Sequence, residues 1–395
     1  MTERRKDRVS NARCYTIPGE GHTLGRILQH QLLKNEKVLF AGYRVPHPSK
    51  NEVELEVQTR GPEFTPRDAL NESLAEAGSQ LEQLKTRFEE LVRRPVGQRR
   101  DKITLKLEGV SIEIANGLRR SMYSEVATLA IDLVNFSEKN TCKNEKFMGH
   151  LLGMVPLQSE NVGTLRYSED CECEGSCGLC SVEFSIDSEK TESGSITTKD
   201  LFSSNRNFLP LQSNARIVQI SCGDSLKLTA IARKGTGKTN AKWCPVSAVA
   251  FQIIPEIVLN PELAKTMTCD QKTKWLASCP FKIFKWCGNS IEIEERYELD
   301  CDYCNMCIRA ADKMRKHDLV KIKERENDDG TYNFVIRVES TGVLKPETIV
   351  REGMDALSKK ISMVQSGLNK LSDHGGTHSL HAKPRPLKNL RITIL

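Results

Sequence analysis

Aromatic residues are scarce in this chain, and long apolar runs are missing. Only 6% of the 395 residues are aromatic, so no base-stacking surface for single-stranded nucleic acid is evident. No apolar run approaches the roughly 18 residues that a membrane-spanning helix needs. The charged residues 2–8 are not followed by an apolar stretch, so no secretory leader is expected. No nucleophile–base set or paired-carboxylate site is recognisable.

The charge balance is also mild. The chain has 58 basic and 52 acidic residues, and its net charge is +6. This balance permits a nucleic-acid role but does not favour one, because the two signs are interspersed. The 14 cysteines, in a chain without a recognisable leader, favour metal ligation over disulfides. We therefore expect an intracellular reducing compartment, no membrane association and little direct contact with nucleic acid.

A strand followed by a long helix is present twice. Residues 53–92 contain an alternating strand, then Thr65-Pro66, then the first helix, and residues 333–371 contain a strand, Lys345-Pro346 and the second helix. In both helices the apolar positions step by 4, 3, 4, 3, 4 and 3 residues, which is a heptad seam. The seam positions are Leu70, Leu74, Ala77, Leu81, Leu84, Phe88 and Leu91 in the first helix, and Val350, Met354, Leu357, Ile361, Val364, Leu368 and Leu371 in the second. The repeat predicts a pseudo-dimer within one chain.

The chain between the two helices is too long to be a connection, and it predicts inserted domains. The charged segment of residues 93–102 is interpreted as a solvated tether, with a phosphate-binding patch as the alternative. The predicted parts are a flexible N-terminus (1–11), a small dimerisation module (12–92), a linker (93–102), a second module (103–135 and 322–371), an insert (136–255), a cysteine-rich domain (256–321) and a flexible tail (372–395). The predicted fold class is α+β, with antiparallel sheets, long helices and a mostly β insert.

Several spaced motifs resemble a known family. Residues 22–33 and 40–48 resemble the small assembly subunit of nuclear RNA polymerase II, its eleventh. Residues 114–120, 149–157 and 234–246 resemble the larger partner, its third subunit. These two proteins are the counterparts of the archaeal L and D subunits and of the bacterial alpha dimer, and the resemblance covers roughly residues 12–370.

The resemblance implies a non-catalytic scaffold. Alpha-type subunits pair head to head and become a platform for the two catalytic subunits, so the implied partners are the second-largest subunit, the largest subunit and a small adaptor subunit. In the family the two subunits are normally separate chains, so their fusion here is a departure. Such a fusion is similar to those expected of large nucleocytoplasmic DNA viruses, which encode their own polymerase. Leu152 also departs from the family, which usually has an arginine there. The implied location is the nucleus for a cellular protein, or the virion and host cytoplasm for a viral one, and the polymerase class stays open between II and I or III.

Two sets of residues follow for the interfaces. Arg119 and Arg120 form either a solvated helix face or, as the resemblance implies, part of the contact with the catalytic subunits, to which Lys242 and Trp243 also belong. The residues predicted for dimerisation are apolar and lie on the helices of the two modules. They are Leu24, Leu28, Leu74, Leu81, Phe88, Leu118, Leu357, Ile361 and Val364.

A first cysteine cluster has the spacing C-x-C-x3-C-x2-C. It consists of Cys171, Cys173, Cys177 and Cys180. Four thiolates this close in sequence suit a tetrahedral structural zinc, with vestigial or free thiols as the alternative. The larger of the two family members carries a zinc site with this spacing.

A second cysteine cluster is C-x2-C-x2-C, formed by Cys301, Cys304 and Cys307. Cys279, which precedes a proline, is the preferred fourth ligand, and Cys287 competes with it. This run is typical of a 4Fe-4S or 3Fe-4S cluster. The resemblance implies a ferredoxin-like domain with a structural cluster, as in the archaeal counterpart of the larger partner, and zinc or an empty relic are the alternatives. An iron–sulfur electron carrier and a free-standing DNA-binding regulator remain the competing functions.

Overall fold

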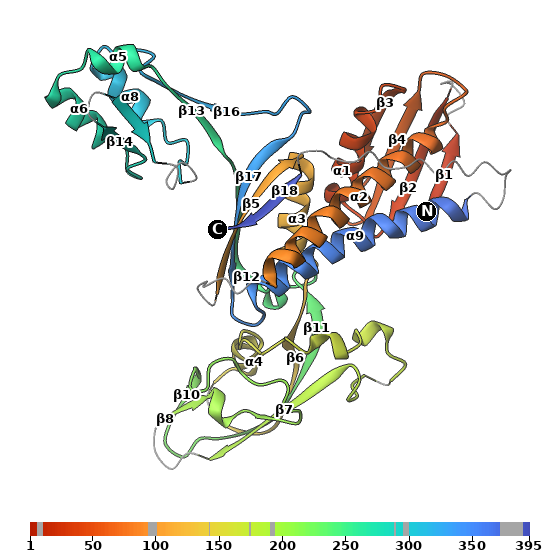
Figure 1. Ribbon diagram of the computed structural model, residues 1–395. Coiled ribbons are helices and arrows are strands. Elements are labelled where there is room, and N and C mark those ends of the chain that lie inside the picture. Colours follow the sequence, from red (N-terminus) through yellow and green to blue (C-terminus); the bar gives the residue numbers. More distant parts are fainter. Residues whose placement is uncertain are drawn as a thin grey trace. The chain divides into compact units, whose positions relative to one another are not determined.

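The computed structural model describes residues 1–5, 11–93, 101–141, 143–173, 175–189, 194–287, 290–294, 300–371 and 390–395 (Figure 1). The chain forms two compact units, each described by itself. Unit 1 comprises residues 1–103, 117–249 and 337–385, and unit 2 comprises residues 104–116, 250–336 and 386–395. Residues 94–100 of the predicted linker and 372–389 of the predicted tail lie outside the described residues.

The first module, in unit 1, is an antiparallel sheet covered by two helices. Its strand order is β1-β2-β4-β3, and β4 buries every second residue, as an alternating strand must when one face packs on a core. Thr65 caps α2 in a capping box with Asp68, and Pro66 takes the first helical position, as the sequence predicts. The elements are β1 (Thr2–Arg5), β2 (Ala12–Pro18), α1 (His22–Leu33), β3 (Val38–Arg44), β4 (Glu52–Thr59) and α2 (Pro66–Val92).

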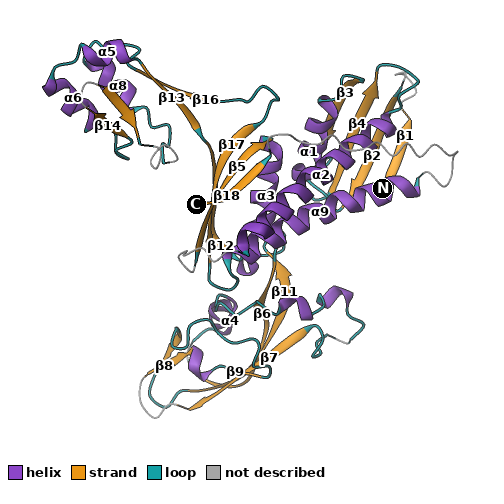
Figure 2. Cartoon of the chain, in the orientation of Figure 1, coloured by secondary structure: helices purple, strands orange, loops and turns teal. Residues whose placement is uncertain are grey.

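The second long helix, α9 (Pro346–Lys370), also lies in unit 1 and packs along α2. Figures 1 and 2 show the two helices side by side, with α3 (Ile112–Ser124) near their crossing. Both predicted seams are buried except for the last residue of each, Leu91 and Leu371, which are partly exposed. The heptad spacing therefore predicts the packed face of both helices correctly.

The insert forms its own sheet and core in unit 1. Its sheet order is β6-β11-β7-β9, and the inner face packs on a cluster that includes Phe184 and Phe208. Leu152, the departure from the family, is buried in this core with 1% of its surface exposed. The elements are β6 (Ala127–Asn140), α4 (Glu145–Gly153), η1 (Val162–Thr164), η2 (Ser168–Asp170), β7 (Ser181–Glu189), β8 (Gly194–Thr197), η3 (Thr198–Asp200), β9 (Phe202–Ser203), β10 (Arg216–Ile220), β11 (Ser225–Thr236) and η4 (Ala241–Trp243).

Unit 2 holds most of a second four-stranded sheet and the cysteine-rich domain. A two-stranded ribbon, β13 with β16, leads into that domain, whose small core surrounds Trp275. Within the described ranges, no helix of either unit is long and apolar enough to cross a membrane. The elements are β5 (Lys102–Val110), β12 (Val246–Ile253), β13 (Pro255–Leu259), α5 (Pro261–Lys265), α6 (Cys269–Leu276), β14 (Phe284–Cys287), β15 (Ser290–Ile293), α8 (Met306–Lys313), β16 (Val320–Glu324), β17 (Tyr332–Ser340) and β18 (Arg391–Ile394).

The four-stranded sheets of the two dimerisation modules have corresponding strand orders, β1-β2-β4-β3 and β18-β5-β17-β12. In chain order, β12 therefore corresponds to β3, and β17 to β4. The second copy is consequently opened at two connections, one between α3 and β12 and one between β12 and β17. The predicted boundaries need two corrections: β6 begins the insert sheet at residue 127 and not 136, and residues 246–253 belong to the sheet of the second module.

The terminal segments also differ from the prediction. Residues 2–5 form β1 on the edge of β2, and residues 391–394 form β18 on the edge of β5. The prediction of flexible ends is therefore wrong for these residues. Leu390 and Ile392 are buried, at 2% and 6% exposure, so an apolar alternation holds β18 on the sheet.

Candidate functional site

The interface formed by α1, α2, α3 and α9 is built from close apolar contacts. A Cβ at Gly78 of α2 would lie 3.8 Å from Ile361 Cγ2 of α9, so the helices approach closely there. A Cβ at Gly117 of α3 would lie 2.8 Å from Ile27 Cδ1 and 3.5 Å from Leu357 Cδ2. The residues predicted for dimerisation are all buried in unit 1: Leu24, Leu28, Leu74, Leu81, Phe88, Leu118, Leu357, Ile361 and Val364.

Charged pairs flank one part of this seam. Lys85 Nζ lies 2.5 Å from Asp355 Oδ1, and Arg351 Nε lies 3.3 Å from Glu89 Oε1. The side chains are about a quarter to a third exposed, so each pair contributes at most about 1 kcal/mol. Sequence reasoning missed these residues, although each follows directly after a seam residue, where charges often choose helix partners.

A more buried charge cluster joins three segments. Lys360 Nζ of α9 lies 2.9 Å from Glu20 Oε2 and 3.1 Å from Glu125 Oε1. Burial raises the pKa of Glu20 above its ordinary value despite the nearby ammonium. Burial also lowers the pKa of Lys360, but attraction to the two carboxylates outweighs it and raises that pKa overall. Lys360 and Glu20 are 340 residues apart in the chain, so no local sequence signal indicates this contact.

The residues predicted to contact catalytic subunits already make contacts within unit 1. Arg120 Nε donates to Thr23 Oγ1 at 2.7 Å, and the Arg119 guanidinium lies over the Tyr123 ring. Lys242 Nζ donates to Asp132 Oδ1 at 2.6 Å. Trp243 is 6% exposed, and its Nε1 donates to the carbonyl oxygen of Arg233. An interface role for this set stays a prediction, and Trp243 would act in it by shaping the surface.

The first cysteine cluster is gathered around one point. Its four Sγ atoms all lie within 4.8 Å of one another, and the close pairs are 3.5 to 3.7 Å apart. A tetrahedron with zinc–sulfur distances of about 2.3 Å has edges of about 3.8 Å, so the thiols fit one metal ion. The members are Cys171, Cys173, Cys177 and Cys180.

Backbone hydrogen bonds and neighbouring thiols shift the pKa values of this cluster in opposite directions. A backbone hydrogen bond from Leu179 and the neighbouring thiols lower the pKa of Cys177 to about 7. A backbone hydrogen bond from Gly175 lowers the pKa of Cys173, but the other thiols raise it to about 12 overall. The loop is tied to β11, because the guanidinium of Arg233 donates to the Gly175 carbonyl at 2.5 Å.

The second cysteine set lies in the core of the cysteine-rich domain. Cys279, Cys301 and Cys307 are each no more than 6% exposed, and Cys304 is half-buried. Burial raises the pKa of Cys307 to about 11, and the other three thiols contribute to that rise. In the described ranges these thiols do not form a group as tight as the first cluster. The side chain of Cys287 lies outside the described residues, so the choice of fourth ligand stays open.

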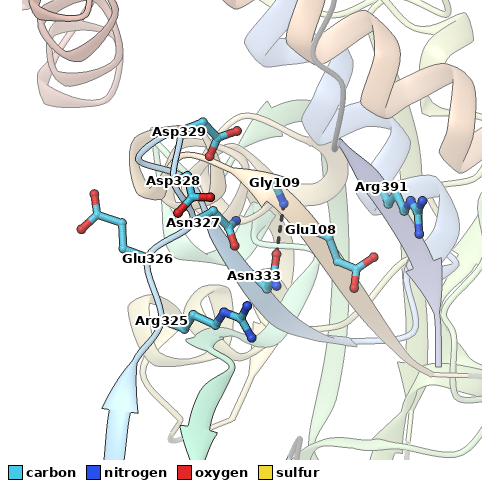
Figure 3. Close-up of a pocket in the computed structure, with 9 residues that line it drawn as sticks. All are labelled: Glu108, Gly109, Arg325, Glu326, Asn327, Asp328, Asp329, Asn333 and Arg391. Carbon is cyan, nitrogen blue, oxygen red and sulfur yellow. Dashed lines mark hydrogen bonds between the residues drawn. The ribbon is translucent and has the colours of Figure 1, made fainter.

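Unit 2 also contains a polar cavity of about 450 Å³ (Figure 3). The N–H of Gly109 donates to Asn333 Oδ1 at 3.1 Å beside it. Its lining mixes both signs of charge and includes none of the predicted site residues. The charged lining residues are Glu108, Arg325, Glu326, Asp328, Asp329 and Arg391.

Comparison with known families agrees with this architecture. The family described as the RNA polymerase Rpb3/Rpb11 dimerisation domain matches residues 12–87 and, a second time, residues 104–361. The chain belongs to this family. The predicted resemblance and the α+β fold with two dimerisation modules are thereby confirmed, and within this family the chain is a non-catalytic component.

Individual relatives come from eukaryotes and archaea. The chain is 36% identical to the DNA-directed RNA polymerase II subunit rpb3 of Dictyostelium discoideum, over 67% of this chain and 90% of that protein. It is 32% identical to subunit 3 of DNA-directed RNA polymerases II, IV and V of Arabidopsis thaliana, over 67% and 87%. It is 27% identical to the DNA-directed RNA polymerase subunit Rpo3 of Methanopyrus kandleri, over 68% and 92%.

Proposed function

We propose that this chain is an assembly subunit of a multisubunit DNA-directed RNA polymerase. In this proposal its two dimerisation modules pair within one chain and nucleate assembly of the two catalytic subunits. The observation that carries the proposal is the packing of α2 on α9, two helices that belong to separate matches of one dimerisation family. The names of the relatives support the polymerase context.

Fusion changes the energetics of pairing. Two separate subunits must meet in solution, whereas two tethered modules face each other at an effective concentration in the millimolar range for a short flexible linker. The fused chain also fixes the ratio of the modules at one to one. Both effects would favour a scaffold that is complete before the catalytic subunits arrive.

The proposed partners are the second-largest subunit, the largest subunit and a small adaptor subunit. Arg119 and Arg120 on α3 and Lys242 near the insert sheet are the proposed contact residues, and the buried Trp243 ring lies beneath the Lys242 ammonium. The nucleus is the proposed location for a cellular protein, because relatives are named as RNA polymerase II subunits.

Affinity purification of the full chain from its native source, followed by mass spectrometry, tests the assembly role. We expect the two largest polymerase subunits in stoichiometric amounts. Replacing Arg119 with Glu should reduce their recovery without unfolding the chain. Purification without any catalytic subunit would contradict the proposal, and tight DNA binding with a steep salt dependence would instead favour a regulator.

For the first cysteine cluster we propose zinc. The metal would bind Cys171, Cys173, Cys177 and Cys180 and hold a loop that has few apolar residues of its own. Metal analysis should find one zinc per chain at this site, and Cys177→Ser should lose it while the exposed Cys222→Ser should not. Equal zinc content in both variants would exclude this ligand set.

For the second cysteine set we propose a structural iron–sulfur cluster on Cys279, Cys301, Cys304 and Cys307. Cys279, Cys301 and Cys307 lie in one small core, and Cys304 is near enough to contribute to the raised pKa of Cys307, which supports the proposal. Anaerobic purification followed by iron, sulfide and zinc analysis should find iron and sulfide, and Cys301→Ser should remove both. Zinc alone would identify a second zinc site, and no metal after reconstitution would identify a relic. A reversible redox signal tied to activity would instead favour an electron carrier.

A further inference from the structure

The seams of α2 and α9 are too similar to decide which helices pair. Both are heptad stripes of the same length and apolar character. A stripe of this kind could also cover a second copy of itself, so that first modules from two chains, or second modules from two chains, would associate. We call a first module paired with a second module the unlike pair, and two copies of the same module a like pair. The selection of the unlike pair therefore needs a feature that differs between the modules.

The repeat defines which positions are equivalent. Equivalent residues of α2 and α9 differ by 280 in number, as Leu81 and Ile361 show. Equivalent residues of α1 and α3 differ by 90: Leu28 corresponds to Leu118, and both are fully buried. Gly19 and Gly109, which precede these helices, have positive φ angles of 80° and 69°, consistent with the same alignment.

The two ion pairs between the long helices lie on one half of the interface. Lys85 and Glu89 of α2 face Asp355 and Arg351 of α9. The four equivalent positions on the other half hold neutral residues, and there Gln365 Nε2 donates to Asn71 Oδ1 at 2.7 Å. The residues equivalent to the charged ones are Gln365 for Lys85, Asn369 for Glu89, Ala75 for Asp355 and Asn71 for Arg351.

Pairing of like modules would lose every one of these ion pairs. Two first modules would place Lys85 against Ala75 and Glu89 against Asn71. Two second modules would place Asp355 against Gln365 and Arg351 against Asn369. Only the unlike pair brings opposite charges together.

The buried contact between Glu20 and Lys360 follows the same rule. The residue equivalent to Lys360 is Gln80, and the one equivalent to Glu20 is Val110. Two first modules would bury the Glu20 carboxylate against an amide. Two second modules would place Lys360 against a valine and leave it with Glu125 of its own module as the remaining carboxylate partner. Because Glu20 and Lys360 side chains are only 10% and 13% exposed, this mismatch costs more than the loss of a surface pair.

We propose that Glu20–Lys360, Lys85–Asp355 and Glu89–Arg351 are specificity-determining pairs that select the unlike module as the pairing partner. The inference rests on the pairing of modules in the proposed function. It adds the residues that direct pairing away from like modules in separate chains. The seam supplies the affinity, and the one-sided charges supply the choice of partner.

Charge reversal in the full chain tests this assignment. One variant carries Lys85→Glu and Glu89→Arg, a second carries Arg351→Glu and Asp355→Lys, and a third carries all four changes; none alters the net charge. The first two should raise the hydrogen-exchange rates of α2 and α9 about tenfold and increase the fraction of two-chain species in native mass spectrometry. The four-fold variant should return to within about twofold of the original protein in both measurements, because complementarity is restored.

A matched control reverses two exposed charges on α9, with Glu352→Lys and Lys359→Glu. It should behave like the original protein. The proposal is overturned if the four-fold variant shows the sum of both defects, or if the first two variants exchange like the original. Failure of this proposal is distinguishable from failure of the proposed assembly function. If the charge reversals had no effect, the original chain could still be purified together with the catalytic subunits. Unprotected α2 and α9 in the original chain would overturn the pairing itself.

Discussion

The two copies of the dimerisation module differ in their connections and resemble each other in their helices. In the first copy, residues 34–37 join α1 to β3 and residues 45–51 join β3 to β4. In the second copy, the same connections span residues 125–245 and 254–331 and contain the insert and the cysteine-rich domain. The seam on the long helix is nevertheless buried in both copies. Connections therefore accept whole domains, whereas the paired helix face keeps its pattern.

The largest expected effect is a charge in the seam. Leu81 and Ile361 are 1% and 4% exposed, so Leu81→Asp or Ile361→Asp buries a carboxylate without a partner. Each should destabilise unit 1 by about 4 kcal/mol or more, measured by chemical denaturation. Met363→Asp is the control, because Met363 lies on the outer side of α9 and is 69% exposed, and it should cost less than about 0.5 kcal/mol. Unchanged melting of both seam variants would refute the pairing of α2 with α9.

Next in size is the loss of the buried ammonium. Lys360→Met leaves Glu20 and Glu125 close together without the ammonium group that pairs with both, which should cost about 3 kcal/mol at neutral pH. The pKa of Glu20 is already raised in the folded state, and the variant raises it further. When the pKa of a carboxyl group is higher in the folded than in the unfolded state, the folded protein becomes less stable as pH rises through the folded-state pKa. The loss of stability in Lys360→Met, relative to the original chain, should therefore shrink as pH falls toward about 4.3.

Unfolding free energies of Lys360→Met measured across this pH range test the sign. Lys359→Met, at the exposed neighbouring position, should show no deficit at either end of the range. A deficit of Lys360→Met that grows on acidification would contradict the carboxylate account.

The terminal strands should differ between the copies. Deleting residues 390–395 removes buried Leu390 and Ile392 from the edge of β5 and should cost roughly 2 kcal/mol. Deleting residues 1–5 removes a strand whose described side chains are all at least partly exposed, and should cost less than about 1 kcal/mol. Hydrogen exchange in β5 and β2 measures the two effects. A larger effect from deleting residues 1–5 than from deleting residues 390–395 would show that β18 does not stabilise its sheet.

The smallest effects concern two helical glycines and should have opposite signs. Gly78→Ala adds a methyl group at an ordinary contact distance of 3.8 Å and should stabilise α2 by roughly 0.5–1 kcal/mol. Gly353→Ala in α9 places a methyl group 2.7 Å from Met122 Cγ and 3.4 Å from the Met122 backbone nitrogen, so packing must shift and about 1 kcal/mol should be lost. Denaturation curves that give both variants the same sign would show that α9 does not pack closely on α3.

The sequence predicts those features whose partners are close along the chain or periodic. The seam is readable because its spacing alone places seven apolar residues on one face of each helix. The tight cysteine cluster is readable because its four ligands lie within residues 171–180. Both are local consequences of residue type and spacing.

The features that sequence reasoning missed depend on contacts between distant segments. The Glu20–Lys360 contact joins residues 340 positions apart. The four-residue strand β18 is stabilised by its pairing with β5, so its own short pattern is too weak to predict it. The predicted domain boundary near residue 135 is wrong because β6 continues through it, from residue 127 to residue 140, without a glycine or proline.

Zero-length carbodiimide cross-linking tests the central claim, intramolecular pairing of α2 with α9, most directly. The reagent joins an amine and a carboxylate in contact, and Lys85 Nζ lies 2.5 Å from Asp355 Oδ1. Isotopically heavy and light chains are mixed before refolding and then cross-linked at low concentration. Pairing within one chain predicts a peptide joining Lys85 to Asp355 that carries only one isotope. Absence of this peptide, or a statistical share of mixed-isotope product, would contradict pairing within one chain.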